Sequence, residues 1–164
     1  MSKKLMVLTA LVVWLIAPVS AIAKPAVTIM TISEKEVEEI IDGREVKSRI
    51  VTSEIEPGET LIFTMKYANK GDERAINVVI GNPIPKDSIY VVGSASGIGS
   101  EIEFSIDDGK TFNLPSLLTY EVNNPSGEQI QMTASPEQYT NIRWTVKEIP
   151  AGQQGEVSFR IRLK

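Results

Sequence analysis

Apolar and polar residues alternate with a period of two along several segments after residue 59, which is the pattern of β-strands with one buried face. The apolar positions that define the clearest segments are Leu61, Phe63, Met65 and Tyr67, then Ile76, Val78 and Ile80, then Ile142, Trp144 and Val146, and finally Val157, Phe159, Ile161 and Leu163. Each group is expected to line one face of a strand and to point toward the core.

Turn-forming residues separate these strands. Residues 69–72 are Asn-Lys-Gly-Asp, in which Gly71 can take positive φ, and residues 150–155 form a polar connection before the last strand. Pro83 and Pro85 end the strand that precedes them, because neither residue can donate a ladder hydrogen bond.

The region before residue 59 is read as further strands. Residues 26–32 are rich in β-formers, and Asp42-Gly43 lies between residues 37–41 and 46–51, as the turn of a hairpin would. A short helix over residues 34–41 is the alternative, because glutamates favour helices; we favour the hairpin. Seven or more short strands with one apolar face each predict an all-β fold, an antiparallel β-sandwich.

The first residues have the pattern of an export signal. A basic start, Met1 to Lys4, precedes an apolar stretch over residues 5–16, and Ala21-Ile22-Ala23 is the small-x-small pattern that a signal peptidase reads. Cleavage is expected after Ala23, which makes Lys24 the first residue of the exported chain. The alternative is an uncleaved membrane anchor over residues 5–23. With cleavage, the protein is extracytoplasmic, in the periplasm or secreted to the surface, with no stable membrane insertion.

Composition excludes much chemistry. Among 164 residues there is no Cys and no His, which excludes disulfides, cysteine nucleophiles, Ser-His-Asp triads and His- or thiolate-bound metals. The chain has 17 Lys+Arg and 21 Asp+Glu, so its net charge is −4, and loss of Lys3 and Lys4 with the leader makes it −6. An acidic balance argues against general nucleic-acid binding.

A family resemblance covers residues 56–164. The motifs that resemble the family are Gly58–Thr64, Tyr67–Gly71, Ala75–Ile80, Asn82–Pro85, Tyr90–Ser96, Ile142–Thr145, Ile149–Gly152 and Val157–Phe159. Their order is similar to the repeat of the DUF11 family of bacterial and archaeal envelope proteins. The resemblance implies an immunoglobulin-like β-sandwich outside the cytoplasm, often found in tandem arrays. This chain has a single copy with a middle insertion over residues 101–137. The expected domains are therefore a signal peptide (1–23), N-terminal strands and a hairpin (24–54) and the DUF11-like β-sandwich (55–164).

The insertion contains a motif over residues 105–112, Ser-Ile-Asp-Asp-Gly-Lys-Thr-Phe, which resembles an Asp-box with Phe in place of Trp. Asp107 can accept backbone hydrogen bonds across the turn, Gly109 can supply positive φ, and Phe112 can return to the core. We interpret the motif as structural. The alternative is a calcium site formed by Asp107, Asp108 and Glu103, although calcium prefers six or more oxygen ligands.

Charge is distributed unevenly along the chain. The acidic run Glu34, Glu36, Glu38 and Glu39 contributes to a net charge of −5 over residues 33–60, whereas residues 139–164 carry +3. If the last two strands pair as neighbours, one outer sheet face is basic, formed by Arg143, Lys147, Arg160, Arg162 and Lys164. These opposite charges, with an open edge at the last strand, predict a weak salt-sensitive contact, with a monomer as the default.

These observations predict a non-catalytic exported β-sandwich module, a structural or protein-interaction component of the cell envelope that requires no cofactor. The partner expected is another envelope protein. A calcium- or carbohydrate-binding module is the alternative. An enzyme is not expected, because nothing in the sequence places two carboxylates together. Trp144 lies on the apolar face of its strand and is assigned to the core rather than to ligand stacking.

Overall fold

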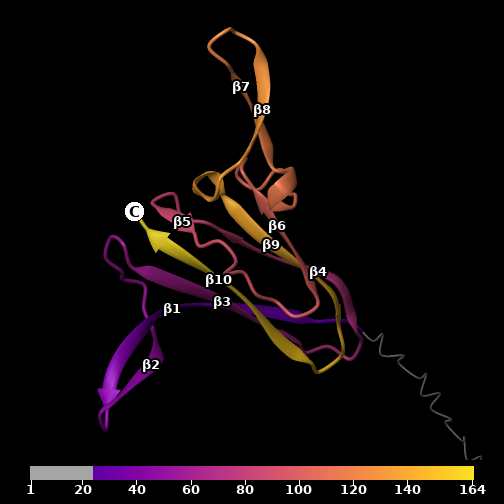
Figure 1. Cartoon of the computed structure of the whole chain (residues 1–164). Helices are drawn as coiled ribbons and strands as arrows, with labels where there is room; N and C mark the ends of the chain where they lie inside the picture. Colours follow the sequence, from indigo (N-terminus) through magenta and orange to yellow (C-terminus); the bar gives the residue numbers. More distant parts are fainter. Residues whose placement is uncertain (1–23) are drawn as a thin grey trace, which may run out of the picture.

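The computed structural model describes residues 24–164, which form antiparallel strands and two short 3-10 helices (Figure 1). The residues of the expected leader and of its cleavage motif up to Ala23 lie outside the described part. The elements are β1 (Val27–Ile41), β2 (Arg44–Val51), β3 (Thr60–Asn69), β4 (Ala75–Pro83), β5 (Ser88–Tyr90), β6 (Ser100–Ser105), η1 (Pro115–Leu117), β7 (Thr119–Asn123), β8 (Gln129–Thr133), η2 (Pro136–Gln138), β9 (Asn141–Ile149) and β10 (Gln154–Leu163).

Two antiparallel sheets form the body of the molecule. The larger sheet has the order β2-β1-β3-β10-β5 and the smaller one the order β4-β9-β6, while β7 and β8 pair only with each other. Trp144 of the smaller sheet contacts Phe159 of the larger, with ring centroids 5.9 Å apart, so the two sheets pack face to face. The all-β antiparallel sandwich predicted from the alternation is confirmed.

The core consists of the alternating apolar positions. Trp144 and Phe159 have no exposed surface, and Phe63 stacks on Phe159 at 5.2 Å across the β3–β10 pairing. The assignment of Trp144 to the core is confirmed. Its indole Nε1 is buried without a hydrogen-bond partner among the described residues.

One predicted strand face is wrong. Ile80 is buried and Val78 half-buried, but Ile76 is 64% exposed. The register passes from Ile76 opposite Glu148 directly to Val78 opposite Val146, and Asn77, with φ of 51°, is left unpaired. The register is the same on both sides of Asn77, so the reversal of the alternation comes from its left-handed backbone conformation, and Ile76 points outward although it is two residues from Val78.

The turn after β3 is confirmed, but its glycine has a different role. Gly71 does not take positive φ; a Cβ atom there would collide with the Lys24 carbonyl, so glycine allows the N-terminal segment to approach closely. Asn69, 1% exposed, holds the same junction together. Its Nδ2 donates to the Glu73 carbonyl at 2.6 Å and the Ile149 carbonyl at 3.0 Å, and its Oδ1 accepts from the amides of Ala26 and Gly71, both at 3.1 Å.

The predicted N-terminal hairpin is confirmed, and the helical alternative over residues 34–41 is wrong. β1 pairs with β3 over Val27–Glu34 and with β2 over Glu34–Ile41, so its first half belongs to the sandwich. Its second half and β2 project from the body as a two-stranded ribbon, which we call the β1–β2 arm (Figure 1).

Only part of the segment 101–137 lies outside the sandwich. Its first residues lie in β6, which pairs with β9 and buries Phe104 in the core. The part that leaves the sandwich is the β7–β8 hairpin, which projects on the other side of the body from the β1–β2 arm (Figure 1). No helix within residues 24–164 is long and apolar enough to cross a membrane.

Candidate functional site

The β1–β2 arm is held by its turn and by one charged face. Asp42 and Gly43 have φ of 52° and 74°, which is the two-residue turn that matches strand twist. On the charged face, Lys47 lies 2.7 Å from Glu38. An exposed pair of this kind contributes little to stability, so it orients the ribbon more than it stabilises it.

Glu36 connects the arm to the body. Arg160 Nη2 of β10 donates to Glu36 Oε1 at 2.6 Å, and Arg49 Nε lies 3.9 Å from the same oxygen. The hydrogen bond from Arg160, with the charge of Arg49, holds the pKa of Glu36 below its ordinary value. The acidic run and the basic C-terminal strand therefore meet within one chain, so these two side chains are already paired before any intermolecular contact.

The predicted basic face does not form. β9 lies between β4 and β6 in one sheet, whereas β10 lies between β3 and β5 in the other, so their cationic side chains point from opposite sides of the sandwich. Arg143 of β9 instead donates to Glu103 at 2.9 Å. β10 is also not an edge strand, because β5 pairs with its end and Ser96 bridges to Ser158.

The opposite face of the arm carries four apolar side chains, and we call it the apolar face. Val37, Ile41, Val46 and Ile50 continue the inward-facing side of the larger sheet, and they share this face with their cross-strand partners Ser48, Arg44, Glu39 and Lys35. Ile41 and Ile50 are 50% and 43% exposed, because the smaller sheet does not reach the arm. An apolar surface that extends a core beyond its covering layer is typical of an interaction site.

The Asp-box-like loop is closed on itself. Asp107 Oδ1 accepts from the Ser105 hydroxyl at 2.6 Å and the Lys110 amide at 3.1 Å, and Oδ2 accepts from the Thr111 hydroxyl at 2.6 Å. These hydrogen bonds, the Ser105 hydroxyl first, hold the pKa of Asp107 well below its usual range. Gly109 takes the expected positive φ of 80°. The carboxylate is thus engaged by its own loop.

Two other expectations for this loop are wrong or unmet. Phe112 does not return to the core; it is half-buried beneath the Arg143 guanidinium, whose Cζ lies 4.3 Å from the ring centroid. Of the three calcium candidates, Glu103 is bonded to Arg143, away from the Asp107 hydrogen-bond set. No group of three or more acidic side chains arranged to hold a metal occurs in the described part of the chain.

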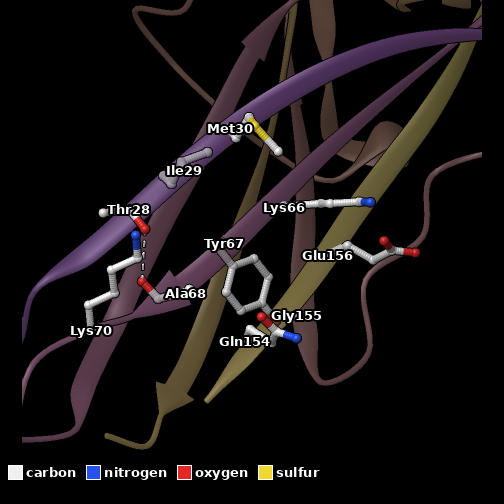
Figure 2. A pocket seen from close by; sticks show the side chains of 10 residues that line it. All are labelled: Thr28, Ile29, Met30, Lys66, Tyr67, Ala68, Lys70, Gln154, Gly155 and Glu156. Atoms are coloured by element: carbon white, nitrogen blue, oxygen red, sulfur yellow. Dashed lines mark hydrogen bonds between the residues drawn. The ribbon is translucent and has the colours of Figure 1, made fainter. Parts of the chain in front are cut away.

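A groove of about 710 Å³ is lined mainly by residues of β1, β3 and β10 (Figure 2). Its floor is built from cross-strand rows, one of which is Met30, Lys66 and Glu156. At one end the Tyr67 ring lies across Gly155, where a side chain would collide with it. The groove mixes both charge signs with an apolar side chain and is open, so it offers a shallow polar surface beside the edge of β1.

The β7–β8 hairpin is a second exposed feature. Ile130 and Met132 of β8 are 40% and 45% exposed. The hairpin rests on the body only through its base, where Leu118 is buried and its carbonyl accepts from the Ala134 amide at 2.7 Å. Two strands with no further layer are marginally stable alone.

Sequence reasoning found the hairpin turn and the charged positions of the arm but missed its apolar face. Whether a strand face is exposed depends on which sheet covers it, and the sequence does not show this. The structure shows it because β1 continues beyond the end of its pairing with β3. Comparisons with protein-family models, with curated proteins and with solved structures find no match to this chain.

Proposed function

We propose that the protein is a non-catalytic module of the cell envelope that binds another envelope protein through the apolar face of the β1–β2 arm. The observation that carries the proposal is the arm itself, a two-faced ribbon with an ion-paired face and an apolar face. The ion pair from Arg160 to Glu36 ties the base of the arm to the body, which lowers the ordering cost on binding.

The exported location rests on the leader pattern. A basic start, an apolar stretch and the Ala21-Ile22-Ala23 motif support removal of the first 23 residues and delivery to the periplasm or the cell surface. The ordered motifs over residues 56–164 support an immunoglobulin-like sandwich of the DUF11 type. Intact-mass measurement of the protein from the envelope fraction tests the leader: a chain starting at Lys24 is expected, and retention of Met1 or Ser2 contradicts export with cleavage.

Two neighbouring isoleucines of the arm give a matched test of binding. Ile41 lies on the apolar face, whereas Ile40, 80% exposed, lies on the charged face opposite Glu45. Both lie at the tip of the arm, with Arg44 as the cross-strand partner of Ile41. Ile41→Lys is expected to release the protein from its complex in a detergent-free envelope extract, measured by size on a native gel, while Ile40→Lys leaves the complex intact.

Equal behaviour of the two variants contradicts the assignment of the apolar face as the binding surface. Loss of the complex in both variants would indicate a general effect of charge at the tip. Retention in both would place the contact elsewhere.

A further inference from the structure

The first half of β1 forms an open edge of the larger sheet. Over Val27–Glu34 the strand pairs with β3 on one side, and β2 covers the other side only from Glu34 onward. Among the described residues, no backbone group bonds to the free side of β1 between Val27 and Thr31. Such an edge presents unpaired donors and acceptors to any strand that approaches.

The direction of these groups follows from two bonds that frame the edge. The Ser33 carbonyl accepts from the Thr52 amide on the β2 side, and the Ala26 carbonyl accepts from the Lys70 amide on the β3 side. Because successive residues of an antiparallel strand bond to opposite sides, the amides and carbonyls of Val27, Ile29 and Thr31 point to the free side.

This edge has none of the usual protection. Residues 27–33 read Val-Thr-Ile-Met-Thr-Ile-Ser and contain no charge, proline or glycine, and Ile29 and Met30 are 48% and 58% exposed. Edge strands that remain unpaired in solution are normally interrupted by lysine, proline or a bulge. An uncharged edge without such an interruption is therefore expected to be paired.

We propose that the occupant is a second copy of this chain, which pairs its own β1 antiparallel across a two-fold axis at Ile29. In this register Ile29 faces Ile29 of the other copy, and Val27 faces Thr31 on either side of the axis. Each of these pairs exchanges two backbone hydrogen bonds. Thr28 faces Met30 on the outer face, beside the groove, so both exposed apolar residues of the strand become covered.

The dimensions of the edge favour this occupant. β2 ends at Val51, and the other copy's β1 starts where β2 stops and runs in the same direction, so the two strands together fill the whole edge of β1. The register also brings the Lys24 end of each copy toward the end of the other copy's edge, where Glu34 and Glu54 lie. The positive Lys24 end of one copy therefore lies near the negative Glu34 and Glu54 of the other, and the uncharged middle of one strand pairs with the same segment of the other.

The self-pairing goes beyond the proposed function and leaves its surface free. The arm begins at Glu34, past the paired segment, so the two arms of the dimer extend in opposite directions. Partner binding by the arm and self-pairing by the edge can therefore fail independently.

Charge substitution at the two-fold axis tests the register. In Ile29→Lys two lysines face each other, and in Ile29→Glu two glutamates do, so each variant is expected to be monomeric at concentrations where the parent protein sediments as a dimer. A mixture of the two variants is expected to restore the dimer, because lysine then faces glutamate. Ile76→Lys, on the exposed face of edge strand β4, is the control and is expected to remain dimeric.

Rescue in the mixture shows that each single variant is folded and that Ile29 faces its own copy. A parent protein that sediments as a monomer at concentrations up to the millimolar range overturns the proposal. Such a result is expected if a different segment or a different protein covers the edge. A dimer that survives Ile29→Lys, or that is lost in both variants without rescue, also overturns it.

Discussion

The buried amide of Asn69 gives the sharpest stability prediction, because all four of its hydrogen-bonding positions are used. It bonds to Ala26 of the N-terminal segment, Gly71 and Glu73 of the following turn, and Ile149 at the end of β9. Asn69→Leu keeps a similar volume but leaves four backbone groups without their partner. Such groups cost about 1–3 kcal/mol each when they stay buried.

Three of the four bonds, those to Ala26, Gly71 and Glu73, are only partly buried, so water can replace the amide there, and the expected loss is about 2–4 kcal/mol. That is a large fraction of the roughly 5–15 kcal/mol that holds a domain folded. The melting temperature should fall by about 10 °C or more for a domain of this size. Thermal and urea unfolding followed by circular dichroism measures both quantities.

Asn123→Leu is the matched control, because Asn123 is exposed at the end of β7. It should melt within about 2 °C of the parent, as surface substitutions do. If Asn69→Leu also melts within about 2 °C of the parent, the amide is not the junction that holds the N-terminal segment, the turn and β9 together.

Three further substitutions test other parts of the fold. Trp144→Ala, in the core, is expected to lower the free energy of unfolding by about 3–5 kcal/mol in urea titrations, and a loss below about 1 kcal/mol would contradict its packing against Phe159. Gly71→Ala should destabilise the chain and raise amide exchange at Ala26, because its Cβ displaces the Lys24 carbonyl; unchanged exchange would refute the close approach. The lowered pKa of Asp107 means that folding favours its carboxylate, so the stabilisation is present above the unfolded-state pKa of about 3.9 and lost as the pH falls below it. Asp107→Ala should therefore show a shallower loss of stability between pH 5 and pH 2 than the parent, and parallel curves would contradict the assignment.

Strand positions were predictable from sequence because alternation is local, whereas sheet membership was not. β9 and β10 are joined by a short turn, which suggests a hairpin, yet Trp144 and Phe159 face each other across the core. Two large side chains on one sheet face would lie side by side instead. The two strands lie in different sheets because their apolar faces are buried against each other. A local sequence pattern does not show this requirement.

The reversed alternation at Asn77 and the junction at Gly71 depended on backbone geometry that the identity of a single residue does not reveal. Asn77 takes positive φ without a glycine, and so the alternation at Ile76 gave the wrong face. Gly71 allows a close approach by residues 24–26, which lie far earlier in the chain. The Asp-Gly turn of the arm, in contrast, was predictable because the turn type itself demands those residues.

The sequence predicted an open sheet edge at the last strand, whereas the structure has one at the first half of β1. The C-terminal strand was expected to be an edge because it is last, but β5 and Ser96 cover it. Edge positions are set by the order of strands in a sheet, which the order along the chain does not determine.

The most direct measurement of the proposed function is site-specific photo-crosslinking from the arm in living cells. A photoreactive residue at position 41, on the apolar face, is expected to form one discrete crosslinked species with an envelope protein. The same residue at position 40, on the charged face of the same ribbon, should form little of it. Equal crosslinking from positions 40 and 41 would contradict binding through the apolar face. So would a result in which a photoreactive residue at the exposed position of Ile98 crosslinks to that protein and one at position 41 does not.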